Sequence, residues 1–177
     1  MQFFTIKDLK EDELILIAQI DRSEEFFEEY IYNNGELITE LKHVLVTGFE
    51  KQELEDILIR QHQILSKEGK IIGVFYLQTL VGVASVERNF RGKHWRYCKM
   101  DILYVSKDYR KMGVGSILLN ASKECGLHFG ADKLYISATP VKNTVDFYLK
   151  HGAVLVKELD DDLYHLEPED IHMEIQL

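Results

Sequence analysis

Two glycines, Gly113 and Gly115, stand between an apolar run ending at Val105 and a run with helical spacing. Two basic residues, Arg110 and Lys111, precede them. At such a junction the first N–H groups of the helix lack partners within the helix, and the helix dipole adds partial positive charge. Because glycine leaves these groups uncovered, the pattern predicts a binding site for an anion, and for phosphate groups in particular.

Three interpretations of this turn compete. A dinucleotide fingerprint needs a third small residue where Leu118 stands, and a P-loop needs Gly-Lys-Ser/Thr where Ser116 and Ile117 follow the turn. A tight turn without a ligand is the third possibility. The helix has an apolar stripe but no capping side chain, which favours an acceptor from outside the chain.

Carboxylates on two neighbouring predicted strands are the candidates for acid–base chemistry. Asp101 lies in the expected strand 97–105 between two apolar residues, and desolvation there is expected to raise its pKa. Glu87, near the end of the preceding strand, is the second candidate. The alternative role for Asp101 is an ion pair with Arg88 or Arg96, or a hydrogen bond at the end of the strand.

The elements that would position these groups form a mixed α/β sheet. Asn34-Gly35 between two β-rich runs predicts a hairpin, because a type I′ turn needs positive φ at both central positions. The later elements alternate between strand and helix, which implies at least one parallel, right-handed crossover. An acidic loop is expected at 158–162. Strands are expected at 3–7, 28–32, 36–41, 70–77, 80–88, 97–105, 133–138, 153–157 and 171–176, and helices at 10–20, 50–67, 114–130 and 143–151.

Composition limits the possible functions. A chain of 177 residues that is 46% hydrophobic, without a repeat or low-complexity stretch, predicts a single domain. Its formal charge of -9 argues against nucleic-acid binding. Residues 1–69 hold 16 acidic and 7 basic side chains, so the whole excess lies there. From Arg88 to Lys111, eight bases and two acids surround the glycine turn, where a polyanionic ligand would lie.

The sequence also predicts a cytoplasmic protein that acts without a membrane or a metal. No apolar run approaches the ~20 residues of a membrane span, and the N-terminus lacks a signal-peptide pattern. Cys98 and Cys125 show neither metal-ligand spacing nor a disulfide framework, which suits a reducing compartment. The histidines show no metal spacing either.

Two segments resemble the GNAT (Gcn5-related N-acetyltransferase) superfamily. The segment YRKMGVGSILL, residues 109–119, resembles its acyl-CoA motif R/Q-x-x-G-x-G/A, and NTVDFYLKHGAVLV, residues 143–156, resembles its Phe-Tyr helix followed by a glycine and a strand. Tyr148 lies 38 positions after Arg110, with one strand between them, as in the family. The N-terminal part also resembles a subset of bacterial GNAT acetyltransferases, through IDRSE and the Asn-Gly hairpin.

The resemblance implies the fold, the co-substrate and the reaction. It implies a GNAT, or acyl-CoA N-acyltransferase-like, fold with an extra N-terminal hairpin, in which 1–69 faces the acceptor, 70–157 binds acyl-CoA and 158–177 adds a last strand. It implies an N-acetyltransferase that uses acetyl-CoA and no metal, and transfers acetyl to a primary amine by direct attack in a ternary complex. The acceptor would be a small-molecule amine or a protein amino group. A second copy of the chain, forming a homodimer, is the other expected partner. A non-catalytic acyl-CoA-binding or regulatory module is the alternative.

By resemblance, Tyr148 is the general acid that protonates the coenzyme A sulfur. Some family members carry a catalytic acid near the position of Asp101, which supports Asp101 as the first candidate base. Glu87, near the end of the neighbouring strand, is the second. The family asparagine that contacts the pantetheine arm is replaced by Val141 here. Asn143, two residues later, takes that contact or caps the helix.

Ten residues of the central stretch complete the expected site. The backbone of the strand end would hold the pantetheine arm, and the turn would hold the pyrophosphate through N–H donors and basic side chains. The ten residues are Leu103, Tyr104 and Val105 in the strand, and Arg110, Lys111, Met112, Gly113, Val114, Gly115 and Ser116 in the turn.

Overall fold

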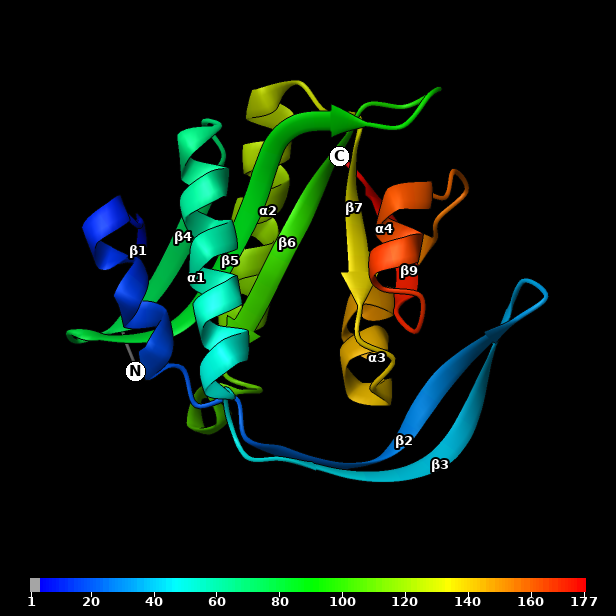
Figure 1. Cartoon of the computed structure of the whole chain (residues 1–177), viewed down its shortest axis with the longest axis horizontal. Coiled ribbons are helices and arrows are strands. Elements are labelled where there is room, and N and C mark those ends of the chain that lie inside the picture. The colour runs from blue at the N-terminus through cyan, green and yellow to red at the C-terminus, as the bar shows by residue number, and fades with distance from the viewer. Residues whose placement is uncertain (1–3) are drawn as a thin grey trace.

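A mixed sheet forms the centre of the computed structural model, which describes residues 4–177 (Figure 1). Within these residues the sheet has seven strands in the order β1-β4-β5-β6-β7-β9-β8, and only the pair β6–β7 is parallel. The expected first strand began at residue 3, which lies outside the described residues. The strands are β1 (Phe4–Asp8), β4 (Lys70–Tyr76), β5 (Thr79–Arg91), β6 (Tyr97–Val105), β7 (Lys133–Ala138), β8 (Val154–Leu155) and β9 (Ile171–Gln176).

Helices cover both faces of the sheet (Figure 1). On one face, α1 (Lys51–Ser66) and the 3-10 helix η1 (Glu11–Gln19) bury Ile57, Ile64, Leu14 and Ile17 against β4, β5 and β6. On the other face lie α2 (Val114–Phe129) and α3 (Lys142–Lys150), after a short 3-10 turn, η2 (Lys107–Tyr109). A fourth helix, α4 (Asp161–Leu166), packs Leu163 on the tyrosines of β6 and β7.

Several expected elements differ from the structure. The expected helix over 10–20 is a 3-10 helix, and the expected strand 153–157 is reduced to Val154–Leu155. The acidic segment expected as a loop begins α4, because Asp160 accepts a hydrogen bond from the Leu163 backbone N–H at 3.0 Å and Leu163 is buried. Acidic residues in the first turn of that helix also suit the helix dipole.

The Asn-Gly hairpin is longer than expected and stands apart from the main sheet. Its strands β2 (Glu24–Asn33) and β3 (Glu36–Val46) pair with each other, with φ of 49° at Asn34 and 94° at Gly35. This ribbon crosses from the side of α1 to that of α3 (Figure 1). There the Tyr30 N–H donates to the Pro140 carbonyl, and the Tyr30 hydroxyl donates to Asp146 of α3, each at 2.8 Å.

The parallel strands β6 and β7 separate part-way along their length. Their pairing runs from Tyr97↔Lys133 to Met100↔Ile136, whereas β6 continues to Val105. The chain after β7 bonds to the ribbon instead, through Pro140 and a bridge between Val141 and Glu29. The backbone groups beyond β7 therefore find partners away from β6, which accounts for the separation.

A β-bulge in β6 lies at the point of separation. Against β5, Met100 pairs with Val86 but Leu103 pairs with Ala84, so β6 holds one residue more than β5 between these pairs. Asp101 and Ile102 consequently both face α1: Ile102 joins the α1 cluster, and Asp101 bonds to side chains of α1. The bulge thus turns a carboxylate to the α1 face at the separation.

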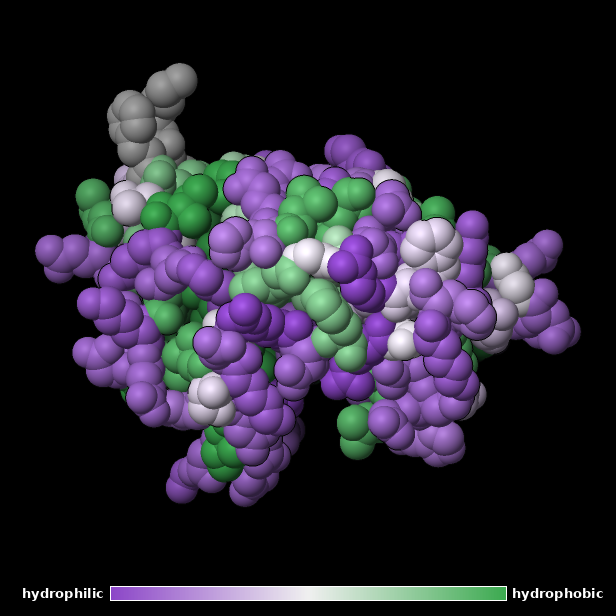
Figure 2. All heavy atoms as spheres, turned by 90° about the horizontal axis from the view of Figure 1, so that it is seen from above, coloured by the Kyte–Doolittle hydropathy of each residue, from purple (hydrophilic) through white to green (hydrophobic). Residues whose placement is uncertain are grey.

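Buried apolar side chains such as Leu14, Leu118 and Met173 fill the space between these layers. On the face seen from above in Figure 2, hydrophilic side chains predominate and apolar ones lie in scattered groups. Among residues 4–177, no helix combines the length and the apolar character needed to cross a membrane.

We expect the buried ion pair of Lys133 in β7 and Glu174 in β9 to stabilise the sheet where β6, β7 and β9 are paired. Their side chains are 5% and 4% exposed, the charged atoms are 2.6 Å apart, and Tyr97 also donates to Glu174. Lys133→Met should lower the free energy of unfolding by about 3–5 kcal/mol, because it leaves a buried carboxylate unpaired. Urea titration measures this change. The double variant Lys133→Met/Glu174→Leu should recover most of the loss, and a double variant no more stable than the single one would contradict this account.

Candidate active site

The turn after β6 presents uncovered N–H groups. Lys111 and Gly113 adopt left-handed backbone conformations with φ of 61° and 88°, and the first hydrogen bond of α2 runs from the Ile117 N–H to the Gly113 carbonyl at 3.0 Å. Among residues 4–177, no acceptor bonds to the N–H groups from Lys111 to Ser116. This run of donors at a helix N-terminus fits phosphate oxygens.

The two glycines of the turn serve different purposes. A Cβ added at Gly113 would meet no atom within 4 Å, so its left-handed backbone is what favours glycine there. A Cβ at Gly115 would lie 3.2 Å from the ring of Phe147 in α3. Gly113 therefore opens the turn toward solvent, whereas Gly115 lets α3 pack against the first turn of α2.

Arg110 is engaged within the fold. Its guanidinium donates to the carbonyls of Val105 and Ser23, each at 3.2 Å, and lies 3.3 Å from the Glu24 carboxylate. Arg110 thus joins the turn to the start of the ribbon. Lys111 is exposed and forms no ion pair with any residue in 4–177, so its ammonium group is available to a phosphate.

Ser116 binds a histidine that sequence reasoning did not select. The Ser116 hydroxyl oxygen lies 2.9 Å from Nε2 of His151, and Nδ1 of His151 lies 2.7 Å from the Phe147 carbonyl. Because a carbonyl only accepts, Nδ1 carries the proton and Nε2 accepts from Ser116. The pair links the end of α3 to the turn after β6, and no local signal in the sequence pairs two residues 35 positions apart.

Asn143 does not cap α3. Val141 holds the N-cap position, so the capping interpretation is wrong. Asn143 lies in the first turn of the helix with its side chain exposed.

The strand end that was expected to hold a ligand has an open backbone edge. Leu103, Tyr104 and Val105 pair with β5 on one side, but their other side faces the separation from β7. Asp101 begins this edge: its side chain is 1% exposed although the residue as a whole is half-buried, so the exposed part is backbone. Extended ligands pair with such free edges.

Tyr148 projects from α3 with 5% of its surface exposed. Burial, with Tyr104 of β6 close by, raises the pKa of the Tyr148 hydroxyl far above its usual value. The hydroxyl therefore holds its proton at neutral pH. No hydrogen bond to another group in 4–177 occupies it, so it can donate that proton to a ligand.

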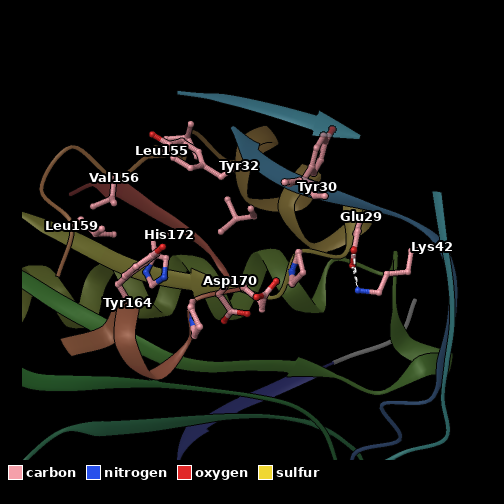
Figure 3. A pocket seen from close by; sticks show the side chains of 15 residues that line it. Glu29, Tyr30, Tyr32, Lys42, Leu155, Val156, Leu159, Tyr164, Asp170 and His172 are labelled. Carbon is pink, nitrogen blue, oxygen red and sulfur yellow. Dashed lines mark hydrogen bonds and ion pairs between the residues drawn. The ribbon is translucent and has the colours of Figure 1, made fainter. Parts of the chain in front are cut away.

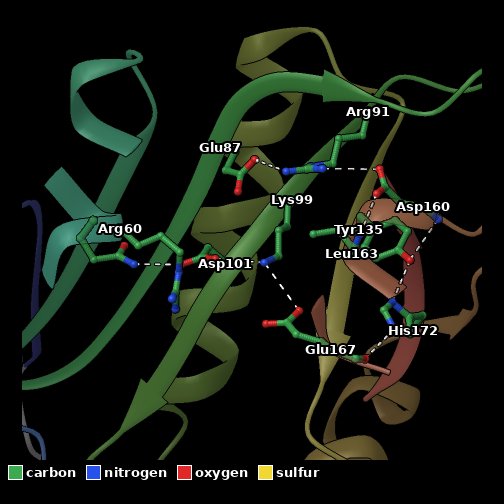
Figure 4. A network of polar contacts seen from close by, with 11 residues as sticks. Arg60, Glu87, Arg91, Lys99, Asp101, Tyr135, Asp160, Leu163, Glu167 and His172 are labelled. Atoms are coloured by element: carbon green, nitrogen blue, oxygen red, sulfur yellow. Dashed lines mark hydrogen bonds and ion pairs between the residues drawn. The ribbon is translucent and has the colours of Figure 1, made fainter. Parts of the chain in front are cut away.

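Asp101 is an ion-paired carboxylate, contrary to expectation. Its oxygens accept hydrogen bonds from Arg60 at 2.7 Å, Gln61 at 2.9 Å and Lys99 at 3.0 Å (Figure 4). Burial opposes ionisation, but the charges of Lys99 and Arg60 and the hydrogen bonds outweigh it and lower the pKa of Asp101. The prediction of a raised pKa is therefore wrong.

The expected ion-pair partners of Asp101 were also wrong. Arg88 pairs with Glu68 and Arg96 with Asp132, whereas the cations that reach Asp101 come from α1 and from β6 itself.

Glu87, the second candidate, shares a cavity with Asp101. The cavity has a volume of about 420 Å³ and lies between α1, the bend of β5, β6 and α4. Glu87 lies 3.2 Å from Arg91, which also pairs with Asp160 at 3.5 Å (Figure 4). The structure thus brings both candidates to one cavity, each already paired with arginine.

A carboxylate that sequence reasoning missed lies nearby, just before β9. Burial and the charge of Glu167 raise the pKa of Asp170 to about 6, although Lys99 opposes the shift. Asp170 lines a second cavity, of about 390 Å³, between the ribbon and α4 (Figure 3). Nothing in the local sequence marks Asp170, because its neighbours come from other elements.

Comparison with known proteins gives a family match. A family model described as the acetyltransferase (GNAT) family matches residues 36–153. Streptothricin acetyltransferase A of Bacillus subtilis (strain 168) is 30% identical over 115 residues, which are 60% of this chain and 59% of that protein. The matched region is thus less than two thirds of the relative's length.

Solved structures share the fold over nearly the whole chain. Nourseothricin acetyltransferase superposes with a TM-score of 0.68 at 18% identity, covering 98% of each chain. A Bacillus anthracis (strain Ames) protein in complex with acetyl coenzyme A gives a TM-score of 0.69 at 18% identity, covering 99% of this chain and 98% of that one. These structures confirm the expected mixed α/β architecture.

We expect Asp101→Asn to lower the free energy of unfolding at pH 7 by about 3 kcal/mol, because the buried Lys99 and the partly exposed Arg60 lose a charged partner. Since the pKa of Asp101 is lowered in the folded protein, its contribution is present above the unfolded-state pKa near ~4 and is lost as pH falls through the folded-state pKa. Urea titrations should show the difference from wild type narrowing below about pH 4.

The exposed Asp108→Asn is the matched control and should leave stability nearly unchanged. A penalty for Asp101→Asn that stays constant through the acid range would contradict the ion-pair assignment.

Proposed function

Because this chain belongs to the GNAT acetyltransferase family, whose model matches residues 36–153, we propose that it transfers an acetyl group from acetyl-CoA to a primary amine by direct attack in a ternary complex. The observation that carries the proposal is the separation of β6 and β7 after Met100 and Ile136. It opens a backbone edge that leads directly to the uncovered N–H groups of the turn.

The residues of this strand and turn fit coenzyme A in order along the chain. The open edge at Leu103–Val105 pairs with the pantetheine arm, and one of its N–H groups polarises the thioester carbonyl. The N–H groups from Lys111 to Ser116 and the Lys111 ammonium hold the pyrophosphate. Asn143, exposed at the start of α3, reaches the same arm.

Tyr148 supplies the proton for the leaving group. Bound acetyl-CoA provides the activated acetyl group, and the amine displaces the sulfur. The buried Tyr148 hydroxyl, which has no protein partner in the described part of the chain, donates its proton to that sulfur. Its raised pKa keeps the phenol protonated until the sulfur leaves. None of the proposed steps uses a metal ion.

The acceptor is a small cationic amine. The relative from Bacillus subtilis is named for acetylation of streptothricin. The acidic excess of this chain lies in residues 1–69, and the described part of that range includes the ribbon and α1. An acidic approach favours an ammonium-bearing acceptor over an anionic one. Streptothricin is therefore the first acceptor to test, with a panel of alkyl amines and lysine-containing peptides beside it.

Release of free thiol from acetyl-CoA measures the activity. We expect release that depends on an added amine, with one acetylated amine formed per thiol. If acetyl-CoA binds but no amine in the panel supports thiol release, the proposal of an N-acetyltransferase is wrong. The alternative, a non-catalytic acyl-CoA-binding or regulatory module, is then favoured.

Gly113→Glu should abolish coenzyme A binding, because the added carboxylate would face the phosphates in open space at the turn. Calorimetric titration with coenzyme A measures the affinity. Gly113→Ala is the matched control: it shares the backbone strain at φ 88° but adds no charge, so it should weaken binding far less. Unchanged affinity of Gly113→Glu for coenzyme A would show that the pyrophosphate does not bind at this turn.

Tyr148→Phe should lower kcat by about 100-fold, because the departing thiolate loses its proton donor, while coenzyme A affinity stays near that of wild type. Steady-state kinetics and calorimetry separate the two effects. Tyr76→Phe, in β4 away from the separation, should keep full activity. Wild-type turnover in Tyr148→Phe would rule out general-acid catalysis by this residue.

A further inference from the structure

Asp170 lies at the mouth of the separation between β6 and β7. The next residue, Ile171, begins β9 and pairs with Ala138, the last residue of β7. Ala138 lies two residues beyond Ile136, where β7 leaves β6. Asp170 is therefore held by the sheet at the end of the strand that borders the proposed transfer site.

The cavity beside Asp170 has the size and lining for a small organic molecule. Its volume is about 390 Å³, and Tyr30 and Tyr32 of β2 and Tyr164 of α4 form walls around it (Figure 3). Tyr30 also packs against the cluster that contains Tyr148. One wall of the cavity thus packs against the same apolar cluster as Tyr148, the proposed proton donor.

The other charged groups around this cavity already have partners or lie in solvent. Lys42 donates to both oxygens of Glu29, at 2.9 and 2.8 Å. His172 lies 2.8 Å from the Tyr135 hydroxyl and 3.1 Å from the Glu167 carbonyl, and burial lowers its pKa, so it stays neutral. Glu169 is exposed at the rim. Asp170 is half-buried and forms no ion pair with any residue in 4–177.

The charges behind Asp170 do not balance. Lys99, with 7% of its side chain exposed, pairs with Asp101 at 3.0 Å and with Glu167 at 3.7 Å (Figure 4). Arg60 pairs with the same Asp101. Asp101 takes up both cations, and the partly exposed Glu167 competes for Lys99, so Asp170 is left without a cation of its own among residues 4–177. A half-buried carboxylate in this position is favoured when it holds a proton or pairs with a cation from outside.

We propose that Asp170 is the catalytic base of this transferase: it pairs with the ammonium group of the acceptor and accepts its proton. The inference rests on the N-acetyltransferase activity proposed above. Its two states, protonated and paired with a cation, are those that a base passes through in each turnover. The pKa of about 6 keeps Asp170 mostly ionised at neutral pH and still basic enough to accept a proton. Asp101, held ionised by Arg60 and Lys99, cannot do so.

Protons and electrons balance through Asp170 and Tyr148. An N–H bond of the ammonium breaks, its proton moves to a carboxylate oxygen of Asp170, and the electron pair stays on nitrogen. That pair forms the C–N bond to the acetyl carbon while the C–S bond breaks, and the sulfur takes the Tyr148 proton. A second proton leaves the nitrogen as the amide forms and restores the Tyr148 hydroxyl. Asp170 then releases its proton to water in the cavity.

Asp170→Asn tests the assignment with two acceptors, butylamine and aniline. Butylamine is an ammonium at the assay pH and needs a base, whereas aniline is already neutral. The variant should lower kcat/KM for butylamine by about 100-fold and for aniline by much less. The limb of the wild-type pH profile near pH 6 should disappear for butylamine, while acetyl-CoA affinity is retained. Asp162→Asn, an exposed acid of α4 outside the cavity, is the matched control and should behave as wild type.

The outcomes separate this inference from the proposed function. Equal losses for both amines, or no loss for either, would overturn Asp170 as the base while leaving an N-acetyltransferase. Absence of transfer to every amine by the wild-type protein would overturn the proposed function and this inference with it. Since a folding defect in the variant would also lower activity, the wild-type carboxyl is titrated by carbon NMR. A midpoint near 6 that shifts downward when butylammonium is added supports the assignment, and a midpoint unaffected by the amine contradicts it.

Discussion

The separation of two parallel strands is the constraint on which the rest of the site depends. β6 and β7 pair as far as Met100 and Ile136, and the chain after β7 then bonds to the ribbon instead. Backbone groups buried without partners are costly, so this change of partner keeps the end of β7 away from β6. The separation leaves the backbone edge at Leu103–Val105 without a neighbouring strand. Tyr148 of α3 packs in a cluster with residues of β6 and β7 beside this edge. The ribbon is thus a structural support of the site as well as a wall of it.

The helices place the remaining groups with respect to this opening. Gly115 allows Phe147 to pack on the first turn of α2, and the bond from Ser116 to His151 fixes the same contact from the other side. Because Tyr148 follows Phe147 in α3, the packing that supports the turn after β6 also sets the position of Tyr148, the proposed proton donor. The turn after β6 and Tyr148 are therefore held in place by the same contact between α2 and α3.

Charge on the α1 face follows a different logic. The bulge in β6 turns Asp101 toward α1, where Arg60 and Lys99 hold it ionised. A carboxylate so strongly paired organises its surroundings and is poorly suited to accept protons. Asp170 is also desolvated and lies near Glu167, but it forms no ion pair with any residue in 4–177, so its pKa moves in the opposite direction. Burial alone does not set the sign of a pKa shift; the balance of neighbouring charges does.

The sequence alone determined the features that depend on local spacing. The glycine turn, the amphipathic α2, the Asn-Gly hairpin and the order of strands from β4 to β7 were all predicted, because each is encoded within a few neighbouring residues. The identity of the family also came from two short motifs, and the family match confirms it. Only the tertiary structure decided the ionisation of Asp101, whose partner Arg60 is 41 positions away, and the exposure of Asp170 to a cavity built by the ribbon, α4 and β9. Ion pairs and cavities join residues distant along the chain, and no local pattern specifies which charges will meet.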